Sequence, residues 1–248
     1  MYDIKVISLQ RTPERLDAFH RQNNHLRYSV FPAIEGALVT ESERKIFIDA
    51  GYSYRPGALG NAISHQQLWG EVVLKDKPLT ICEDDAIFHK NFDVLSCKVL
   101  SYLDVDWDIC LWGWNFDSIL LCNFPQGLSN CSMVFDQNAL RENFLGYITE
   151  DINSLPLPLL QCFGTICYTI SPKGAKKFLS QTHPIKKMNV FFPSLNRALE
   201  NVALDISMSA FYSDNKSYVA FPPLVITKNE VESSTVQSPQ LKPIRLYI

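Results

Sequence analysis

A run of apolar, β-compatible residues that ends in three adjacent carboxylates is the feature that most constrains this fold. Leu79 to Cys82 are apolar or β-branched, and Glu83, Asp84 and Asp85 follow directly. A buried parallel strand has this pattern, with functional residues at its carboxyl end. Adjacent carboxylates repel one another, and a bound Mg²⁺ or Mn²⁺ relieves that repulsion because hard cations take oxygen ligands. The pattern favours a metal–phosphate site at the edge of an α/β sheet; a solvated acidic turn is the alternative.

The composition of the 248-residue chain is that of one enzyme-sized globular unit. The chain is 46% hydrophobic, enough to fill a core, and 20% charged, too little for a disordered protein. The formal net charge of −3 and the pI near 6.0 provide no basic footprint, so we expect no nucleic-acid partner. Because no repeat or linker divides the sequence, we expect a single domain over residues 1–248.

The lack of targeting signals and the spacing of the cysteines predict a cytoplasmic location. The chain opens without a basic segment followed by a long apolar run, so we expect no signal peptide. No stretch approaches the roughly 20 apolar residues that a membrane helix needs. The seven cysteines form no C-x-x-C pair and no Cys/His zinc spacing, which favours reduced, mostly buried thiols.

Apolar runs and helix-start signals alternate along the chain. Expected strands cover residues 4–9, 28–31, 79–83, 107–112 and 163–170. Expected helices begin at Pro13 and Pro172, each one residue after a Thr or Ser N-cap, and a third lies within 57–75. Strand–helix–strand order with short connections predicts an α/β fold with parallel strands. Residues 113–138 show no clear period, and we interpret them as a long irregular loop that would cover the substrate.

Four sequence blocks follow one another in a familiar order and spacing. They are Val6-Ile7-Ser8-Leu9-x-Arg11-x3-Arg15, Gly57-x2-Gly60-x3-Ser64-His65-x3-Trp69, Glu83-Asp84-Asp85 and Phe163-Gly164-Thr165-x2-Tyr168-x-Ile170-Ser171-x2-Gly174-Ala175. Together they resemble glycosyltransferase family 25, the lipopolysaccharide and lipooligosaccharide glycosyltransferases. Asp205 and Pro222-Pro223-Leu224 match later landmarks, so the resemblance covers nearly the whole chain. Asn61 departs from the pattern, which leads us to expect Cys there, and we interpret this departure as a packing difference.

The resemblance implies a GT-A-like nucleotide-sugar-binding fold, with a central, mostly parallel sheet flanked by helices. The nucleotide-sugar half would cover about residues 1–112 and the acceptor half about residues 113–248. The resemblance also implies an inverting transfer of galactose or glucose from a UDP-sugar, with Mn²⁺ or Mg²⁺ as cofactor. A UDP-sugar reacts by losing a diphosphate, and a metal ion neutralises the growing negative charge as a Lewis acid.

The acidic triplet would serve the metal and the donor. We expect Glu83 and Asp85 to hold the ion, Asp85 directly and Glu83 through water, unless Glu83 holds the ribose instead. Asp84 would point away from Asp85 if the strand geometry persists. We place Asp84 at the nucleotide, and a role in orienting nearby backbone is the alternative.

Five more residues are candidates for donor binding. Ser8, Leu9 and Arg11 follow the first strand, where α/β sheets bind ligands, so backbone groups there would hold uracil. Arg11 or Arg15 would face the diphosphate because a guanidinium offers paired donors. The alternative for Arg15 is an exposed helix residue. His65 would contact the nucleotide, or it is a hydrogen-bonded structural histidine.

An inverting transfer needs a base that takes the proton of the acceptor hydroxyl, away from the departing diphosphate. Asp205 is our candidate, because its apolar neighbours would desolvate the carboxylate and raise its basicity. A helix-capping or salt-bridged aspartate is the alternative. Glu150, Asp151 and Glu230 are rival bases.

We therefore expect a hexosyltransferase with a UDP-hexose donor and a lipooligosaccharide or oligosaccharide acceptor. Contact with the inner face of the cytoplasmic membrane would be peripheral at most, since no basic amphipathic helix stands out. One alternative is a metal-dependent phosphohydrolase, although Glu83-Asp84-Asp85 lacks the D-x-D arrangement of a nucleophilic aspartate. The other alternative is a nucleotide-sugar or glycan-binding module without turnover.

Overall fold

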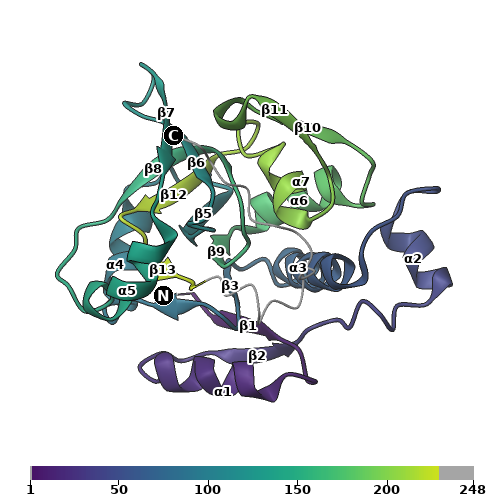
Figure 1. The fold of residues 1–248 in the computed structure, drawn as a ribbon, viewed down its shortest axis with the longest axis horizontal. Helices are drawn as coiled ribbons and strands as arrows, with labels where there is room; N and C mark the ends of the chain where they lie inside the picture. The colour runs from purple at the N-terminus through teal and green to yellow at the C-terminus, as the bar shows by residue number, and fades with distance from the viewer. Residues whose placement is uncertain (1, 229–248) are drawn as a thin grey trace.

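A nine-stranded mixed sheet forms the centre of the computed structural model, which describes residues 2–228 (Figure 1). The order across this sheet is β2 (Ser29–Pro32), β1 (Ile4–Ser8), β3 (Leu79–Glu83), β9 (Cys167–Ile170), β5 (Ile109–Gly113), β12 (Ser217–Phe221), β8 (Leu155–Cys162), β6 (Ile119–Asn123) and β7 (Asn130–Val134). Strands β2, β1, β3, β5, β12 and β6 run one way, and β9, β8 and β7 run the other. Two small sheets pair β10 (Asn189–Phe192) with β11 (Arg197–Glu200) and β4 (Ile87–Phe88) with β13 (Val225–Ile226).

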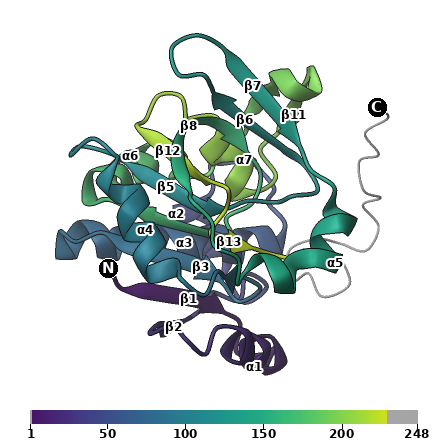
Figure 2. The ribbon, with the colours of Figure 1, turned by 90° about the vertical axis from the view of Figure 1, so that its left-hand side faces the viewer.

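Helices cover both faces of the central sheet. They are α1 (Pro13–Gln22), α2 (Glu41–Phe47), α3 (Pro56–Lys75), α4 (Phe92–Ser101), α5 (Gln137–Tyr147), α6 (Pro172–Thr182) and α7 (Leu204–Ser209). Helices α3, α6 and α7 share a hydrophobic core with one face of the strands, and α1 and α4 share a second core with the other. Figure 1 shows α3 and α4 on opposite sides, and Figure 2 shows the sheet extending from β2 to the β6–β7 hairpin. The expected α/β class, a central sheet flanked by helices as in a GT-A-like domain, is confirmed.

The strongest local signals formed the expected elements. Helix α3 begins with Pro56 in its first turn, spans 20 residues and buries Leu68 and Trp69 completely. Helix α6 begins after Ser171, whose Oγ atom accepts a hydrogen bond from the N–H of Gly174 at 3.0 Å. That bond satisfies a backbone donor that the first helical turn leaves free.

A glycine lets α3 approach the segment that follows β2. A Cβ atom on Gly60 would lie 2.3 Å from the carbonyl oxygen of Ile34, closer than van der Waals contact allows. One turn later, Ser64 accepts from the N–H of Ile34 at 2.8 Å and donates to the carbonyl of Gly60 at 2.7 Å. The Gly-x3-Ser spacing of the second block therefore joins α3 to residues 34–36.

The prediction of an irregular loop over residues 113–138 was wrong. Ile119–Asn123 and Asn130–Val134 pair as the β6–β7 hairpin, and α5 begins at Gln137. The apolar residues of β6 are buried, and Gly127 adopts a φ of 75° in the turn between the strands. The Gly, Asn and Pro residues therefore mark the turns of a hairpin rather than one long loop.

Two further differences concern the segment before α6. The strand expected over 163–170 is shorter, because only Cys167–Ile170 pair as β9. Residues 155–162 form β8, which the sequence did not predict because Pro156 and Pro158 argue against a strand inside a sheet. Strand β9 lies between β3 and β5, so the expected halves 1–112 and 113–248 share one sheet.

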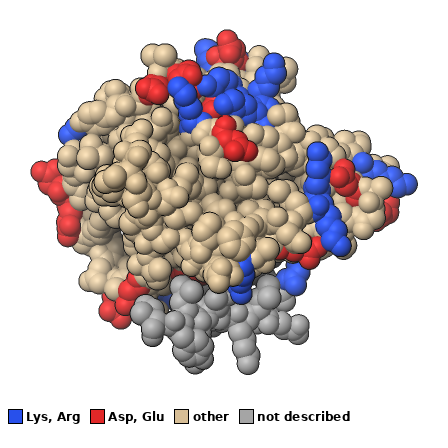
Figure 3. All heavy atoms as spheres, turned by 90° about the horizontal axis from the view of Figure 1, so that it is seen from above, with Lys and Arg blue, Asp and Glu red and all other residues tan. Residues whose placement is uncertain are grey.

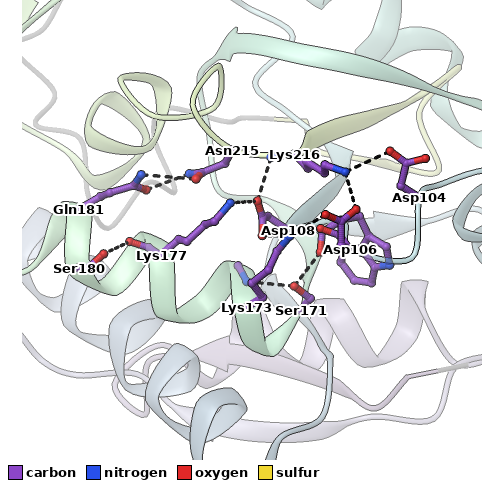
Figure 4. Close-up of polar contacts among 12 residues, drawn as sticks. Asp104, Asp106, Asp108, Ser171, Lys173, Lys177, Ser180, Gln181, Asn215 and Lys216 are labelled. Atoms are coloured by element: carbon purple, nitrogen blue, oxygen red, sulfur yellow. Dashed lines mark hydrogen bonds and ion pairs between the residues drawn. The ribbon is translucent and has the colours of Figure 1, made fainter.

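Figure 4 shows a cluster of ion pairs at the start of β5. The acidic triplet lies at the end of β3, which runs the same way, so the two groups lie at opposite ends of the strands. Asp108, which is fully buried just before β5, accepts from Lys177 Nζ at 2.5 Å and from the N–H of Lys216 at 2.9 Å. Lys173 Nζ lies 3.3 Å from Asp108 Oδ1. These contacts join the start of β5 to α6 and to the start of β12, so the cluster has a structural role.

The surface agrees with the weak net charge of the sequence. On the face shown in Figure 3, lysine and arginine side chains lie among carboxylates and wide uncharged areas rather than in one basic surface. Within residues 2–228, no helix combines the length and the apolar character needed to cross a membrane.

Candidate active site

The acidic triplet lies where two parallel strands end side by side. Strands β1 and β3 pair in parallel with Ile7 opposite Glu83, so Ser8 and the triplet occupy the same sheet edge. Ser8 is buried, and its Oγ atom donates to Asp84 Oδ2 at 2.7 Å. The first block and the triplet therefore lie together at one end of the sheet, where Ser8 contacts Asp84.

Arg15 on α1 reaches the same carboxylate from the other side. Its Nε atom donates to Asp84 Oδ1 at 2.8 Å, and its Nη2 atom lies 3.8 Å from Asp85 Oδ2. Burial alone would lower the pKa of Arg15, but the hydrogen bond with Asp84 and the charge of Asp85 raise it. Arg15 is only 16% exposed, so it is not the exposed helix residue of the alternative interpretation. It holds the triplet together, and Asp84 is occupied by protein donors.

Glu83 is held by three side chains on its Oε1 atom. Asn61 Nδ2 donates at 3.1 Å, Thr165 Oγ1 donates from the loop before β9, and His65 Nε2 lies 3.5 Å away. Burial alone would raise the pKa of Glu83, but His65, Thr165 and Asn61 together lower it. These three side chains favour the ionised form of Glu83 and fix the orientation of its carboxylate.

His65 lies behind Glu83 rather than at the surface. Its side chain is fully buried, with Nδ1 2.7 Å from the hydroxyl of Tyr168. It has no exposed surface that a nucleotide could touch. The structure corresponds to the second interpretation of His65, a hydrogen-bonded histidine inside the protein.

Asp85 differs from its two neighbours because one of its oxygens is buried without a hydrogen-bond partner among the described residues. A third of its side chain is exposed, and its buried Oδ1 atom has no hydrogen-bond partner within residues 2–228. Burial and the nearby charge of Glu83 raise the pKa of Asp85, and Arg15 opposes them. A desolvated carboxylate with an unused oxygen beside another carboxylate is where a cation would be stabilised most.

The donor set fits a divalent ion that a bound substrate helps to hold. Within residues 2–228, no three His, Cys, Asp or Glu side chains are grouped to bind a metal by themselves. Mg²⁺ in nucleotide sites is usually held by one or two carboxylates together with phosphates and waters. Asp85 fits the direct ligand. Asn61 and Thr165 already donate to Oε1 of Glu83, so Glu83 would contact the ion through a water molecule.

A small pocket opens beside the triplet. Its walls include Ile7, Leu9, Arg11, Arg15, Ala33, Ile34, Glu35, Gly36, Gly57, Asn61, Glu83 and Asp84. Its volume of about 50 Å³ is below the roughly 300–1,000 Å³ of typical small-molecule sites, so it would hold only part of a nucleotide sugar. Arg11 is half exposed at its mouth and pairs with Glu35 at 2.5 Å. Leu9 contributes the carbonyl that accepts from the N–H of Thr12 at 3.2 Å.

Asp205 reaches this edge of the sheet through the loop before β9. It lies at the start of α7, and its Oδ2 atom accepts from the N–H of Gly164 at 2.8 Å. Gly164 adopts a φ of 91°, and a Cβ atom there would lie 2.4 Å from Asn115 Oδ1, so only glycine fits. Burial raises the pKa of Asp205, as its sequence context predicted, and the negative charge of Glu83 adds to this effect.

The rival bases lie elsewhere or outside the described residues. Glu150 and Asp151 are exposed after α5, where the carbonyl of Glu150 lies 2.9 Å from His89 Nε2. Glu230 lies outside the described residues. Of the three candidates within residues 2–228, only Asp205 hydrogen-bonds the loop that also contacts Glu83, through Gly164 beside Thr165.

Sequence reasoning missed two side chains that contact Glu83. Asn61 was interpreted as a packing difference, but it donates to Glu83 and lines the pocket, so that interpretation was wrong. Thr165 was part of the fourth block without an assigned role. A signal existed in both cases, since each is a hydrogen-bond donor inside a block that otherwise holds glycines and core residues.

Comparison with known proteins identifies the family. The family model for glycosyltransferase family 25 (LPS biosynthesis protein) matches residues 1–193, which include the triplet, Asn61, His65 and Thr165. The chain belongs to glycosyltransferase family 25. This membership makes it a glycosyltransferase of lipopolysaccharide biosynthesis and confirms the resemblance seen in the four blocks. Glu83 and Asp85 both lie inside the matched region.

Other comparisons add little to the family 25 assignment. No curated protein matches the chain. Among solved structures, the crystal structure of A197 from STIV is similar with a TM-score of 0.39 and 11% identity, covering 88% of this chain and 81% of that chain. A TM-score this low leaves the function to be argued from the site itself.

Proposed function

We propose that this family 25 protein is an inverting, metal-dependent hexosyltransferase that moves galactose or glucose from a UDP-sugar to a lipooligosaccharide acceptor. The observation that carries the proposal is the unused, buried Oδ1 atom of Asp85 beside the fixed carboxylate of Glu83. Both oxygens of Asp84 already accept hydrogen bonds from Ser8 and Arg15, so Asp84 is not assigned to the metal.

The donor would lie across the pocket with its diphosphate at Asp85. Leu9 lines the pocket and Ser8 ends β1 just before it, so we assign their backbone groups to uracil. Arg11 would exchange Glu35 for a phosphate oxygen, since its guanidinium is half exposed and a phosphate offers the same paired acceptors as a carboxylate. A bound Mn²⁺ or Mg²⁺ would act as a Lewis acid on the leaving diphosphate, held by Asp85 directly and by Glu83 through water.

Asp205 would act on the acceptor. Its carboxylate takes the proton of the acceptor hydroxyl while that oxygen forms a bond to the anomeric carbon. The bond from this carbon to the diphosphate oxygen breaks on the opposite face, and UDP leaves with the electron pair. Burial raises the pKa of Asp205 and so makes it a stronger base than an exposed aspartate.

The test is release of UDP by the purified chain. Each of UDP-galactose, UDP-glucose and the UDP-N-acetylhexosamines is incubated with Mn²⁺, with and without a lipooligosaccharide acceptor. We expect UDP release that depends on acceptor and metal, with a product of inverted anomeric configuration by NMR. Metal-dependent UDP binding without turnover on any donor would instead support the binding module, and release of UMP and hexose 1-phosphate would support the phosphohydrolase.

A further inference from the structure

Three buried side chains form a line that ends at Glu83. Trp69 Nε1 donates to the hydroxyl oxygen of Tyr168 at 2.8 Å, and this hydroxyl lies 2.7 Å from His65 Nδ1. His65 Nε2 then lies 3.5 Å from Glu83 Oε1. These three side chains are at most 1% exposed, and the contact with Glu83 is the one polar contact of His65 Nε2 within residues 2–228.

The chemistry of these groups fixes where the protons lie. An indole N–H can only donate, so the Tyr168 oxygen accepts from Trp69 and keeps its own proton for another acceptor. Glu83 Oε1 already receives the amide N–H of Asn61, which shows that this oxygen is an acceptor. A neutral His65 therefore pairs with both neighbours only if Nε2 carries its proton and Nδ1 accepts from Tyr168.

The other tautomer leaves several groups without partners. With the proton on Nδ1, His65 would donate to Tyr168, and the buried tyrosine proton would lose the acceptor that it has within residues 2–228. The Nε2 lone pair would also face the oxygen of Glu83 and repel it. Buried polar groups without partners cost about 1–3 kcal/mol each, which favours the first arrangement.

We propose that Tyr168 is a positioning residue, which holds His65 as the Nε2–H tautomer so that His65 fixes the carboxylate of Glu83. This inference rests on the proposed function for the role of Glu83, but the tautomer itself does not. His65 and Trp69 are one turn apart on α3, whereas Tyr168 and Glu83 lie on the neighbouring strands β9 and β3. The line thus connects the helix to the catalytic edge of the sheet.

The tautomer is tested by NMR on the ¹⁵N-labelled full chain. Long-range ¹H–¹⁵N correlation distinguishes a protonated from an unprotonated ring nitrogen, and His65→Gln identifies the His65 signals among the five histidines. We expect a protonated Nε2 and an unprotonated, hydrogen-bonded Nδ1 at neutral pH. In Tyr168→Phe, the Nδ1 signal should move toward that of a nitrogen without a hydrogen bond. A protonated Nδ1 in the wild-type chain overturns the proposal.

A second experiment separates positioning from mere packing. His65→Gln keeps one acceptor and one donor, whereas His65→Met has a similar size and neither group. If His65 positions Glu83, the Gln variant should retain at least about tenfold more transfer activity than the Met variant, in line with the 10–100-fold effects of groups that orient metal ligands. Equal activity of the two folded variants contradicts the positioning role.

Tyr168→Phe should lower transfer by about 10-fold or more. Tyr147→Phe is its matched control, because Tyr147 donates to the carbonyl of Pro223 at 2.7 Å and has no contact with the line. This control should leave transfer unchanged. If no donor is turned over by the wild-type chain while the expected His65 signals are present, the proposed function fails and the tautomer assignment stands.

Discussion

The backbone N–H of Gly164 donates a hydrogen bond to Oδ2 of Asp205 at 2.8 Å. The next residue, Thr165, donates to Glu83, so one short loop connects the proposed base to the acidic triplet. A carboxylate that must take a proton from the acceptor is thereby kept at a fixed place relative to the donor side of the site.

Asp205→Asn should lose transfer and keep donor binding. The amide has nearly the same shape but cannot take the acceptor proton, and a general base contributes typically ~10²–10⁴-fold to the rate. Isothermal titration with UDP and Mn²⁺ should give an affinity close to that of the wild-type chain, beside a transfer assay that shows the loss in kcat. If UDP binding disappeared together with activity, Asp205 would be a donor-site or structural residue.

Asp85→Asn should reduce transfer by orders of magnitude while the protein stays folded. The substitution removes the charge of the proposed direct ligand, and a Lewis acid supplies several kcal/mol of stabilisation. The transfer rate and the unfolding temperature are measured together, with Asp93→Asn, an exposed aspartate at the start of α4, as the control. Near-normal metal-dependent turnover in the folded Asp85 variant would remove Asp85 from the metal site.

Chelation should abolish transfer, and Mn²⁺ or Mg²⁺ should restore it. The reason is the pair of carboxylates Glu83 and Asp85, with one buried oxygen that no described residue engages. Activity is followed after exhaustive dialysis against EDTA and again after each metal is added back. Full activity of the dialysed enzyme would show that the triplet acts without a divalent ion.

Gly60→Ala should destabilise the protein, and Gly70→Ala on the same helix should not. Alanine normally stabilises a helix relative to glycine by about 1 kcal/mol. At Gly60 the new methyl group would meet the Ile34 carbonyl 2.3 Å away, whereas at Gly70 nothing lies within 4 Å. Urea unfolding of both variants gives the two changes in free energy. A Gly60 variant as stable as the Gly70 variant would show that α3 and residues 34–36 need not approach so closely.

Asp108→Ala should lower the free energy of unfolding by about 1.5–3 kcal/mol, the range for hydrogen bonds to charged groups. Asp108 is fully buried and joins Lys177 to the N–H of Lys216. Asp106→Ala is the control, because its side chain is 51% exposed and its ion pairs are screened by water. Both variants should keep full transfer per folded molecule, since the cluster lies at the start of β5, whereas the acidic triplet lies at the end of β3, which runs the same way.

The sequence by itself determined the elements whose signals are local. The apolar run into Glu83, the Pro13 and Pro172 helix starts and the apolar face of α3 each depend on neighbouring residues, and each formed as predicted. The order of the four blocks also identified the family. Local signals failed where partners are distant: β8 is a strand despite two prolines because β12 and β6 pair with it on either side.

Only the tertiary structure decided what each carboxylate of the triplet does. Three acidic residues in a row are chemically alike, and their sequence cannot show which donors reach them. Folding brings Ser8 and Arg15 to Asp84, and Asn61, Thr165 and His65 to Glu83. Among residues 2–228, it leaves one oxygen of Asp85 without a partner. These contacts join residues from 18 to 82 positions apart in the sequence. The packing of α1, α3 and the loop before β9 against one end of the sheet brings them together.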